Sequence, residues 1–224
     1  MNKKVAVLLA GCGVYDGAEI YESVLTLLRL DQQNASYQCF APKVPQMHVI
    51  NHATGEPSSE SEAGQAAARD VFTEAARLAR GEIKDLAEAA VEDFDAIILP
   101  GGFGVAKNFS NFAVAGAECE VNPEVQALVQ AFHQAGKPIG LMCIAPALTA
   151  KLIAPGALCT IGNDAGVEGE LTAMGALHKT CAVDDIVVDN SRKLVTTPAY
   201  MLATRISEAQ AGIFKLVDKV LELA

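Results

Sequence analysis

Three short, mostly apolar runs, each followed by a glycine or proline turn, constrain the fold of this chain more than any other feature. They cover Val5–Ala10, Asp95–Leu99 and Ile139–Cys143, and a shorter run of the same kind covers Tyr37–Phe40. Apolar runs of this length are typical of strands that are buried on both faces of a parallel sheet. The glycines and prolines behind them indicate tight turns at the strand ends.

Segments with helical patterns separate these strands. We expect Asp16 to be the N-cap of the first helix, with Glu19 as its capping-box partner. The core-facing stripe of this helix is predicted to be Ile20, Val24, Leu27 and Leu28. Further helices are expected over 66–79, 83–90, 122–133 and 147–153 and from 206 onward, and further strands over 158–161, 180–183, 185–189 and 193–197. This alternation predicts an α/β fold: a doubly wound, mainly parallel sheet with helices on both faces and a small antiparallel addition.

Size and charge narrow the functional classes. The 224 residues, 51% of them hydrophobic, can form one large core, so we expect a single domain over residues 1–224. A net charge of −10, with no Lys/Arg cluster, argues against binding to nucleic acid or to an anionic membrane surface. The apolar runs are too short to span a bilayer, and the N-terminal residues resemble neither a signal nor a transit peptide, so we expect a cytoplasmic protein. The polar stretch 43–64 is predicted to be a long excursion from the sheet.

The six cysteines, at positions 12, 39, 119, 143, 159 and 181, show no zinc-ligand spacing, and we expect no metal. In a cytosolic protein they should be reduced, and most free cysteines are small buried apolar residues. Cys143 has a more specific setting, because it ends a buried strand and precedes Ile144-Ala145-Pro146 at a helix start. This pattern predicts a nucleophile elbow, and a helix N-terminus should lower the pKa of the thiol. The alternative is a structural thiol at a strand end.

Ligands of such sheets bind beyond the carboxyl ends of the strands, which directs attention to Cys12, Gly101, Gly102 and Cys143. Gly101 and Gly102 are candidate oxyanion donors, although an ordinary tight turn would also use them. Glu22 could face the strand ends and hydrogen-bond a thiolate, whereas periodicity alone favours a solvated surface glutamate. The glycine spacing after the first strand does not fit a dinucleotide fingerprint.

Histidines are scattered along the chain. Only His178, beside the late strands, is a candidate base, and a packing or surface role is equally compatible with its position.

Several motifs together resemble a known family. Gly-Ala-Glu-Ile-Tyr-Glu at 17–22, Pro-Gly-Gly at 100–102 and Gly-Leu-Met-Cys-Ile-Ala-Pro at 140–146 are similar to the PfpI/ThiJ superfamily, also called class I glutamine amidotransferase-like proteins. The segments 10–17, 49–56, 100–108, 142–147 and 195–202 resemble its ElbB branch, a set of glyoxalase-like enzymes once associated with isoprenoid biosynthesis. The resemblance runs end to end and implies a flavodoxin-like sheet.

By that resemblance Cys143 is the nucleophile, Glu22 shares a proton with it, and Gly102 and Ile144 supply oxyanion amides. Gly101 and Cys12, at neighbouring strand ends, join them as candidate substrate-binding residues. The implied activity is cofactor-free conversion of glyoxal or methylglyoxal, small dicarbonyl compounds, to a hydroxy acid, with protein deglycation as a related activity. We also expect a homodimer.

The general base stays open, because Ile144 stands where many family members have a histidine. Glu22 alone, or Glu22 helped by His178, would have to move the proton. A non-catalytic thiol sensor or interaction protein is the alternative function, and a glutamine amidotransferase is a weaker third.

Overall fold

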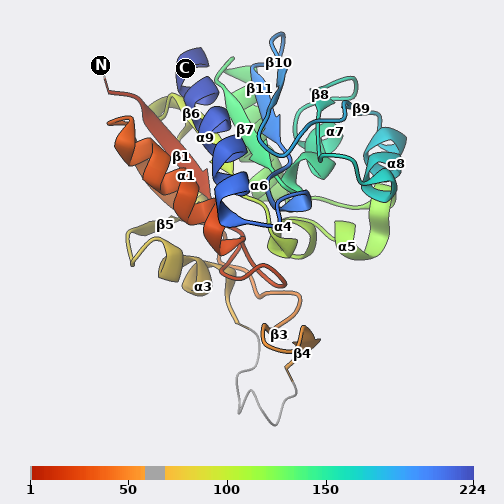
Figure 1. The fold of residues 1–224 in the computed structure, drawn as a ribbon. Helices are drawn as coiled ribbons and strands as arrows, with labels where there is room; N and C mark the ends of the chain where they lie inside the picture. The colour runs from red at the N-terminus through yellow and green to blue at the C-terminus, as the bar shows by residue number, and fades with distance from the viewer. Residues whose placement is uncertain (1, 59–68) are drawn as a thin grey trace.

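The computed structural model describes residues 2–58 and 69–224 and has a seven-stranded central sheet in the order β10-β11-β7-β6-β1-β2-β5 (Figure 1). Every neighbouring pair is parallel except β10 and β11, which are antiparallel. The predicted α/β class, with a mainly parallel sheet and a small antiparallel addition, is confirmed. Two short two-stranded sheets, β3-β4 and β8-β9, lie outside the central one.

The strands of the central sheet are β1 (Lys4–Leu8), β2 (Ser36–Ala41), β5 (Ile83–Asp85), β6 (Ala96–Leu99), β7 (Ile139–Met142), β10 (Val187–Asp189) and β11 (Leu194–Thr197). The short strands are β3 (Ile50–Asn51), β4 (Glu56–Pro57), β8 (Leu158–Cys159) and β9 (Leu177–His178). The α-helices are α1 (Ile20–Gln32), α3 (Val71–Leu78), α4 (Phe103–Lys107), α5 (Phe112–Ala115), α6 (Pro123–Gln134), α7 (Thr149–Leu152), α8 (Ala165–Ala173) and α9 (Ile206–Leu223). Short 3-10 helices include η4 (Ala145–Leu148) and η5 (Ala199–Met201).

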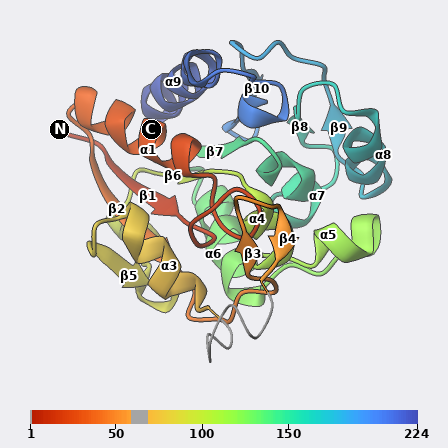
Figure 2. The same cartoon turned by 60° about the horizontal axis from the view of Figure 1, so that its bottom comes forward.

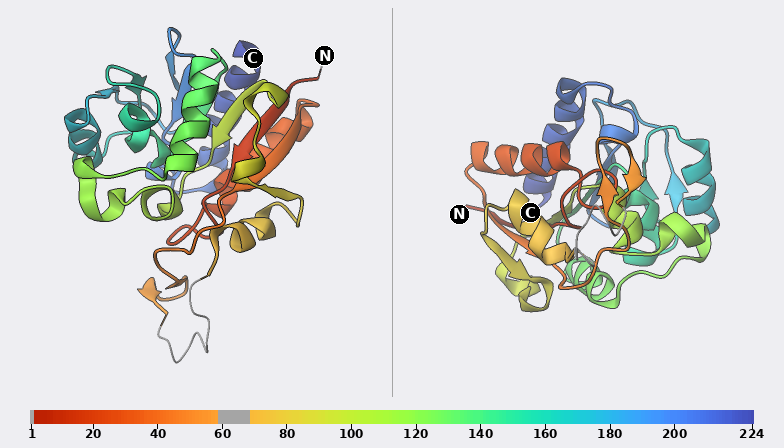
Figure 3. Two further views of the ribbon diagram at one scale, coloured as in Figure 1. Left: turned by 180° about the vertical axis from the view of Figure 1, so that it is seen from behind. Right: turned by 90° about the horizontal axis from the view of Figure 1, so that it is seen from below.

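The apolar runs are buried strands because both faces of the sheet are covered. Along β1, Val5 and Val7 belong to a core with α1, α3 and α9, whereas Ala6 and Leu8 belong to a second core with α6. Side chains of a strand alternate between faces, so a fully apolar run serves both cores. Figure 2 shows α1 and α9 on one side of the sheet, and Figure 3 shows α6 across the opposite side.

The start of α1 differs from the prediction. Its N-cap is Glu19, whose side chain accepts a hydrogen bond from the Glu22 N–H at 2.6 Å, so the expected Asp16 cap is wrong. Asp16 is instead buried and accepts from the Ile50 N–H at 2.7 Å. Glu19 can serve as the cap here because its carboxylate reaches an orphan amide of the first turn.

The predicted apolar stripe of α1 is also wrong at three of its four positions, and only Leu27 packs, partly buried, against the core. The side chains of Ile20, Val24 and Leu28 are exposed, whereas the core-facing residues are Glu22, Ser23, Leu25, Thr26 and Leu30. The helix therefore buries a face that contains polar side chains and leaves an apolar face outside. Hydrophobicity alone could not identify which face packs on the sheet.

Other segments agree or differ in part. The helices expected at 122–133 and from 206 are confirmed as α6 and α9. The excursion 43–64 includes the β3-β4 hairpin, and its residues 59–64 lie outside the described residues. Residues 83–90, predicted to be helical, form β5 and a 3-10 turn, because β5 completes the sheet edge beside β2. No strand forms at 180–183. Of the helix expected at 66–79, residues 66–68 lie outside the described residues and the rest gives α3.

The two chain ends lie close together at the amino end of the central strands (Figure 1). Lys3, immediately before β1, donates from Nζ to the carbonyl of Ala224, the last residue of the chain. Lys193, before β11, donates to the carbonyl of Leu223 at 3.0 Å. These contacts fasten the end of α9 beside the start of β1.

Gly140 in the middle of β7 allows α9 to pack closely on the sheet. A Cβ at this position would lie 2.9 Å from Leu216 Cδ2 and 3.1 Å from Val220 Cγ2, both on α9. Contacts that short require these side chains, or the helix that carries them, to move.

We expect Gly140→Val to lower the free energy of unfolding by about 1–3 kcal/mol through overpacking. The matched control is Gly169→Ala in α8, where an added Cβ meets open space and should stabilise by about 0.5–1 kcal/mol. Urea denaturation of the three proteins measures both effects. Equal stability of Gly140→Val and wild type would show that α9 does not depend on this close approach.

Candidate active site

The carboxyl ends of neighbouring strands bring three predicted segments together. β1, β6 and β7 are adjacent in the sheet, so the turns after them share one edge. A Cβ placed on Gly101, after β6, would lie 2.4 Å from Cys143 Cβ, after β7, and 2.9 Å from Glu22 Oε2. Glycine at 101 therefore makes room for the cysteine and the glutamate to meet.

Cys143 occupies a nucleophile elbow, as the sequence predicts. Its φ of 59° is left-handed, an unusual conformation for a residue with a side chain. The Cys143 N–H donates to the carbonyl of Thr197 at 3.1 Å, which fixes the elbow to the end of β11. The chain continues into η4 and then α7, so the turn leads into a short 3-10 helix rather than directly into an α-helix. Strained backbone of this kind is concentrated at functional sites.

Glu22 is completely buried beside the thiol, not solvated. Its Oε2 accepts from the Gly101 N–H at 2.7 Å, and its Oε1 accepts from the Tyr200 N–H at 3.2 Å. The carboxyl group also hydrogen-bonds the side chain of Cys143. The glutamate thus reaches from the first turn of α1 to the ends of β6, β7 and β11.

Burial dominates the electrostatics of this pair. It raises the pKa of Glu22 to about 7, with a further rise from the Glu19 carboxylate, while hydrogen bonds from Tyr200, Gly101 and Cys143 oppose the rise. Burial and then the Glu22 carboxylate raise the pKa of the Cys143 thiol, so the expected lowering by a helix N-terminus is wrong. Above about pH 7 the pair therefore holds one proton, which lies mainly on the Cys143 sulfur, and the thiolate forms when that proton passes to Glu22.

Two backbone amides face the sulfur. The N–H groups of Gly102 and Ile144 hydrogen-bond Cys143 and lower the pKa of its thiol. Gly102 has a φ of 93°, and a Cβ there would lie 2.4 Å from the Glu19 nitrogen, so only glycine fits. These amides can stabilise negative charge on sulfur or on an oxygen bonded beside it. Gly101 differs from the prediction, because its N–H is occupied by Glu22 and serves the glutamate rather than an oxyanion.

A cavity of about 310 Å³ opens at Cys143. Its walls come from the turns after β1, β6, β7 and β11 and from α4, α5 and the start of α8. The described residues that line it are Val14, Gly102, Phe103, Ala106, Phe112, Ala113, Cys143, Ile144, Asp164, Val167, Tyr200 and Met201. The thiol itself is only 7% exposed, so reagents must enter this cavity to meet it.

Two predicted site residues lie elsewhere. Cys12 is not among the described residues that line the cavity, and burial followed by the Glu74 carboxylate raises the pKa of its thiol. Cys12 follows β1, but its thiol lies near α3, which carries Glu74 and Arg77. We therefore remove Cys12 from the candidate substrate-binding residues.

His178 is likewise separate from the described lining of the cavity. Its Nε2 accepts from the Ile161 N–H at 3.4 Å, and its Nδ1 lies 3.4 Å from Glu168 Oε2. Both ring nitrogens are engaged between β8-β9 and α8, which is the packing role that the sequence left open.

Tyr200 is a site residue that the sequence analysis did not identify. It follows β11 in η5, its N–H holds Glu22, and its ring lies 6.0 Å from that of Tyr21 on α1. The strand-end rule already used for β1, β6 and β7 would have indicated it if applied to β11, which pairs with β7.

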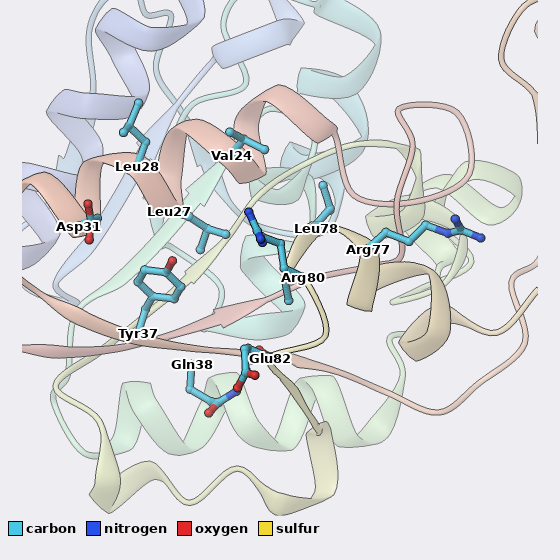
Figure 4. Close-up of a pocket in the computed structure, with 11 residues that line it drawn as sticks. Val24, Leu27, Leu28, Asp31, Tyr37, Gln38, Arg77, Leu78, Arg80 and Glu82 are labelled. Carbon is cyan, nitrogen blue, oxygen red and sulfur yellow. Dashed lines mark hydrogen bonds between the residues drawn. The ribbon is translucent and has the colours of Figure 1, made fainter.

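A larger hollow of about 1000 Å³ lies between α1, β2 and α3. Figure 4 shows Leu27 and Leu78 on its walls, with the Arg80 guanidinium between α1 and α3. It is a broad open groove, and no cysteine or histidine is among the described residues that line it. The candidate active site is therefore the smaller cavity at Cys143.

Within residues 2–58 and 69–224, no group of three or more His, Cys, Asp or Glu side chains could hold a metal ion. No helix in this part of the chain is long and apolar enough to cross a membrane.

The parallel sheet and the cysteine elbow define a class I glutamine amidotransferase-like domain. Within that class the chain belongs to the DJ-1/PfpI family, which matches residues 72–204. The human protein named glutamine amidotransferase-like class 1 domain-containing protein 3, mitochondrial, is 48% identical over 98% of this chain and 83% of its own. The rat ES1 protein homolog, mitochondrial, is 47% identical over 98% of this chain and 84% of its own.

Solved structures agree with this assignment. The Ehrlichia chaffeensis isoprenoid biosynthesis protein with amidotransferase-like domain has a TM-score of 0.90 and 35% identity, covering 99% of each chain. Drosophila melanogaster DJ-1beta has a TM-score of 0.58 and 19% identity, covering 100% of this chain and 96% of its own, and shows the shared fold. The resemblance to the superfamily is confirmed; the narrower ElbB assignment remains a prediction.

The shifted pKa of Glu22 makes a testable contribution to stability. A carboxyl whose pKa rises from 4.5 to about 7 on folding stabilises the protein below about pH 4.5 and loses that contribution as pH rises through 7. The loss is roughly 3 kcal/mol at about 1.4 kcal/mol per pKa unit. Between about pH 5 and pH 8 the free energy of unfolding of the wild type should fall by this amount. We expect Glu22→Gln, which has no carboxyl group to titrate at this position, to lack that fall.

Denaturant titrations at several pH values measure this difference. Glu92→Gln, at an exposed position, is the control and should retain the wild-type pH dependence. Parallel curves for wild type and Glu22→Gln would contradict a proton held by Glu22.

Proposed function

We propose that this protein is a cysteine-dependent, cofactor-free glyoxalase that converts glyoxal or methylglyoxal to the corresponding hydroxy acid. The observation that carries the proposal is the Cys143–Glu22 pair beside the Gly102 and Ile144 amides at the cavity. A nucleophile, a proton carrier with a pKa near 7 and two oxyanion donors are the groups that such a reaction needs.

The reaction balances without a cofactor. The Cys143 thiolate attacks the aldehyde carbon, and Glu22 gives its proton to the resulting alkoxide, which makes a hemithioacetal. A base then removes the hydrogen of that carbon as a proton, and a proton returns to the adjacent carbonyl carbon through an enediol. The first carbon is thereby oxidised to a thioester and the second reduced to an alcohol. Water hydrolyses the thioester, releasing the hydroxy acid and the Cys143 thiol.

Glu22 is the proton carrier in this proposal. Its pKa of about 7 lets it both donate and accept near neutral pH. A positioned acid or base contributes about 10²- to 10⁴-fold to such a step. With both carboxyl oxygens held by backbone amides, Glu22 has little freedom to follow the proton between two carbons, so we expect slow turnover.

The other functional hypotheses have less support. Sensor cysteines are usually exposed at the surface, whereas Cys143 is buried and lies at the cavity. A glutamine amidotransferase would need a histidine at the thiol, and no histidine is among the described residues that line the cavity. Protein deglycation would use the same hemithioacetal chemistry and stays a related possibility within the proposal.

Oligomeric state and location are also part of the proposal. The exposed apolar side chains of α1 (Ile20, Tyr21, Val24 and Leu28) support a homodimer, because apolar patches of this kind are typical of interfaces. The N-terminal residues led us to expect the cytoplasm, whereas the human and rat relatives are named mitochondrial. Analytical sedimentation of the purified protein tests the homodimer. Fractionation of cells that express a tagged copy of the protein tests its location.

The first catalytic test is steady-state turnover of glyoxal and methylglyoxal. Cys143→Ser should abolish it, and Glu22→Gln should lower kcat by about a hundredfold or more. Glu19→Gln is the matched control, because it keeps an oxygen that can cap α1 and should affect kcat far less. A Glu22→Gln enzyme with normal kcat would contradict the proton role of Glu22.

A second test concerns His178. Because its ring is engaged by Ile161 and Glu168, we expect His178→Asn to lower stability and leave kcat and its pH profile unchanged. Intact mass should still report aldehyde adducts on Cys143. Loss of both turnover and adduct formation would show that His178 takes part in catalysis.

A further inference from the structure

We infer that the preferred substrate of this site, among the α-oxoaldehydes that it converts, is an uncharged compound whose apolar substituent is larger than the hydrogen of glyoxal or the methyl group of methylglyoxal. This inference rests on the proposed glyoxalase function and concerns only which dicarbonyl compounds fit the cavity. It depends on the volume, the lining and the charge of the space in front of Cys143.

The cavity is larger than the smallest dicarbonyl compounds need. Its volume of about 310 Å³ corresponds to about ten water molecules at roughly 30 Å³ each. Glyoxal has only two carbons and two oxygens, and methylglyoxal adds one methyl group. A bound glyoxal would leave most of the cavity to water, next to walls that offer that water few hydrogen bonds.

The walls are apolar. Val14, Ala106, Phe112, Val167 and Met201 line the cavity together with Ile144 beside the nucleophile. Phe112 and Ala106 are also packed into the protein core, so this wall is held in place. An alkyl or aryl group against such a wall displaces water, and each added methylene should raise kcat/KM by about fourfold.

The charge of the cavity disfavours anions. No Lys, Arg or His is among the described residues that line it, and Asp164 is the one carboxylate there. Asp164 is exposed and caps α8 through a hydrogen bond from the Val167 N–H at 2.9 Å. With a net charge of −10 on the chain, an anionic substrate meets no compensating group. The hydroxy acid product carries a carboxylate, so the same lack of cations favours its release.

The aldehyde end of the substrate is fixed by the chemistry. The Gly102 and Ile144 amides at the sulfur bind the aldehyde oxygen of the substrate. The substituent then lies against the part of the lining that α5 and α8 contribute. These elements belong to a different part of the fold from β1, β6 and β7, which lead into the catalytic turns (Figure 2). Changes in α5 should therefore alter the choice of substituent.

The first experiment compares kcat/KM for glyoxal and for methyl, propyl and pentyl α-oxoaldehydes. We expect kcat/KM to rise along the series, and to fall at least tenfold when a carboxylate replaces the terminal methyl of the pentyl compound. Cys143→Ser corrects for reaction without the thiol. The inference is wrong if turnover depends on Cys143 but kcat/KM stays flat or falls along the series, or if the carboxylate compound is used equally well. Either result would leave the proposed function intact.

A substitution in α5 tests where the substituent lies. Ala113→Leu narrows the cavity and should lower the ratio of pentyl to methyl kcat/KM by at least fivefold. Val114→Leu is the matched control, because Val114 is the next residue of α5, is 76% exposed and is not among the lining residues. An unchanged ratio in Ala113→Leu would contradict the inferred position.

A third measurement is independent of turnover. Labelling rates of Cys143 with N-alkylmaleimides of increasing chain length, followed by intact mass, should rise along the series and fall for a carboxylate-ended reagent. If no α-oxoaldehyde is turned over, the proposed function fails, while rising labelling rates still support an apolar, anion-excluding site. Flat labelling rates would overturn that description of the cavity.

Discussion

The buried carboxyl group of Glu22 is the contact on which the geometry of the candidate site depends. It ties the first turn of α1 to the Gly101 turn after β6 and to Tyr200 after β11, and it meets Cys143 after β7. A carboxylate without water is costly unless it is hydrogen-bonded or protonated, so the surrounding amides and the shared proton are what make its burial possible. One side chain thereby links four segments around Cys143 and affects the protonation of its thiol.

The fold was largely predictable from the sequence because its strands are short, apolar and buried on both faces. The runs at 5–10, 95–99 and 139–143 became β1, β6 and β7, side by side in the sheet. The prediction failed where packing overrides pattern. Residues 83–90 look helical in composition but contain β5, and the packed face of α1 contains Glu22, Ser23 and Thr26. No pattern of hydrophobicity can show that a polar helix face is the buried one.

The candidate site was predictable in part for a similar reason. The strand-end rule selected Cys143, Gly101 and Gly102, which the structure brings together, but it also selected Cys12, which is not among the described residues that line the cavity. The resemblance to a family indicated Glu22, which periodicity would have assigned to the surface. The pKa of Cys143 was mispredicted because a helix N-terminus is a local feature, whereas the desolvation that dominates here depends on the whole surrounding core. The position of His178 depends on β8, β9 and α8, whose arrangement is also a matter of tertiary packing.

The position of the chain ends has a practical consequence. Lys3 and Ala224 meet at the amino end of the central strands, whereas the Cys143 cavity opens at their carboxyl end. A purification tag, a fluorescent reporter or a surface linker attached at either terminus therefore emerges on the side opposite the cavity mouth. The same closeness of the ends suits the chain to circular permutation, in which a short linker joins the present termini and new ones are opened in a surface loop.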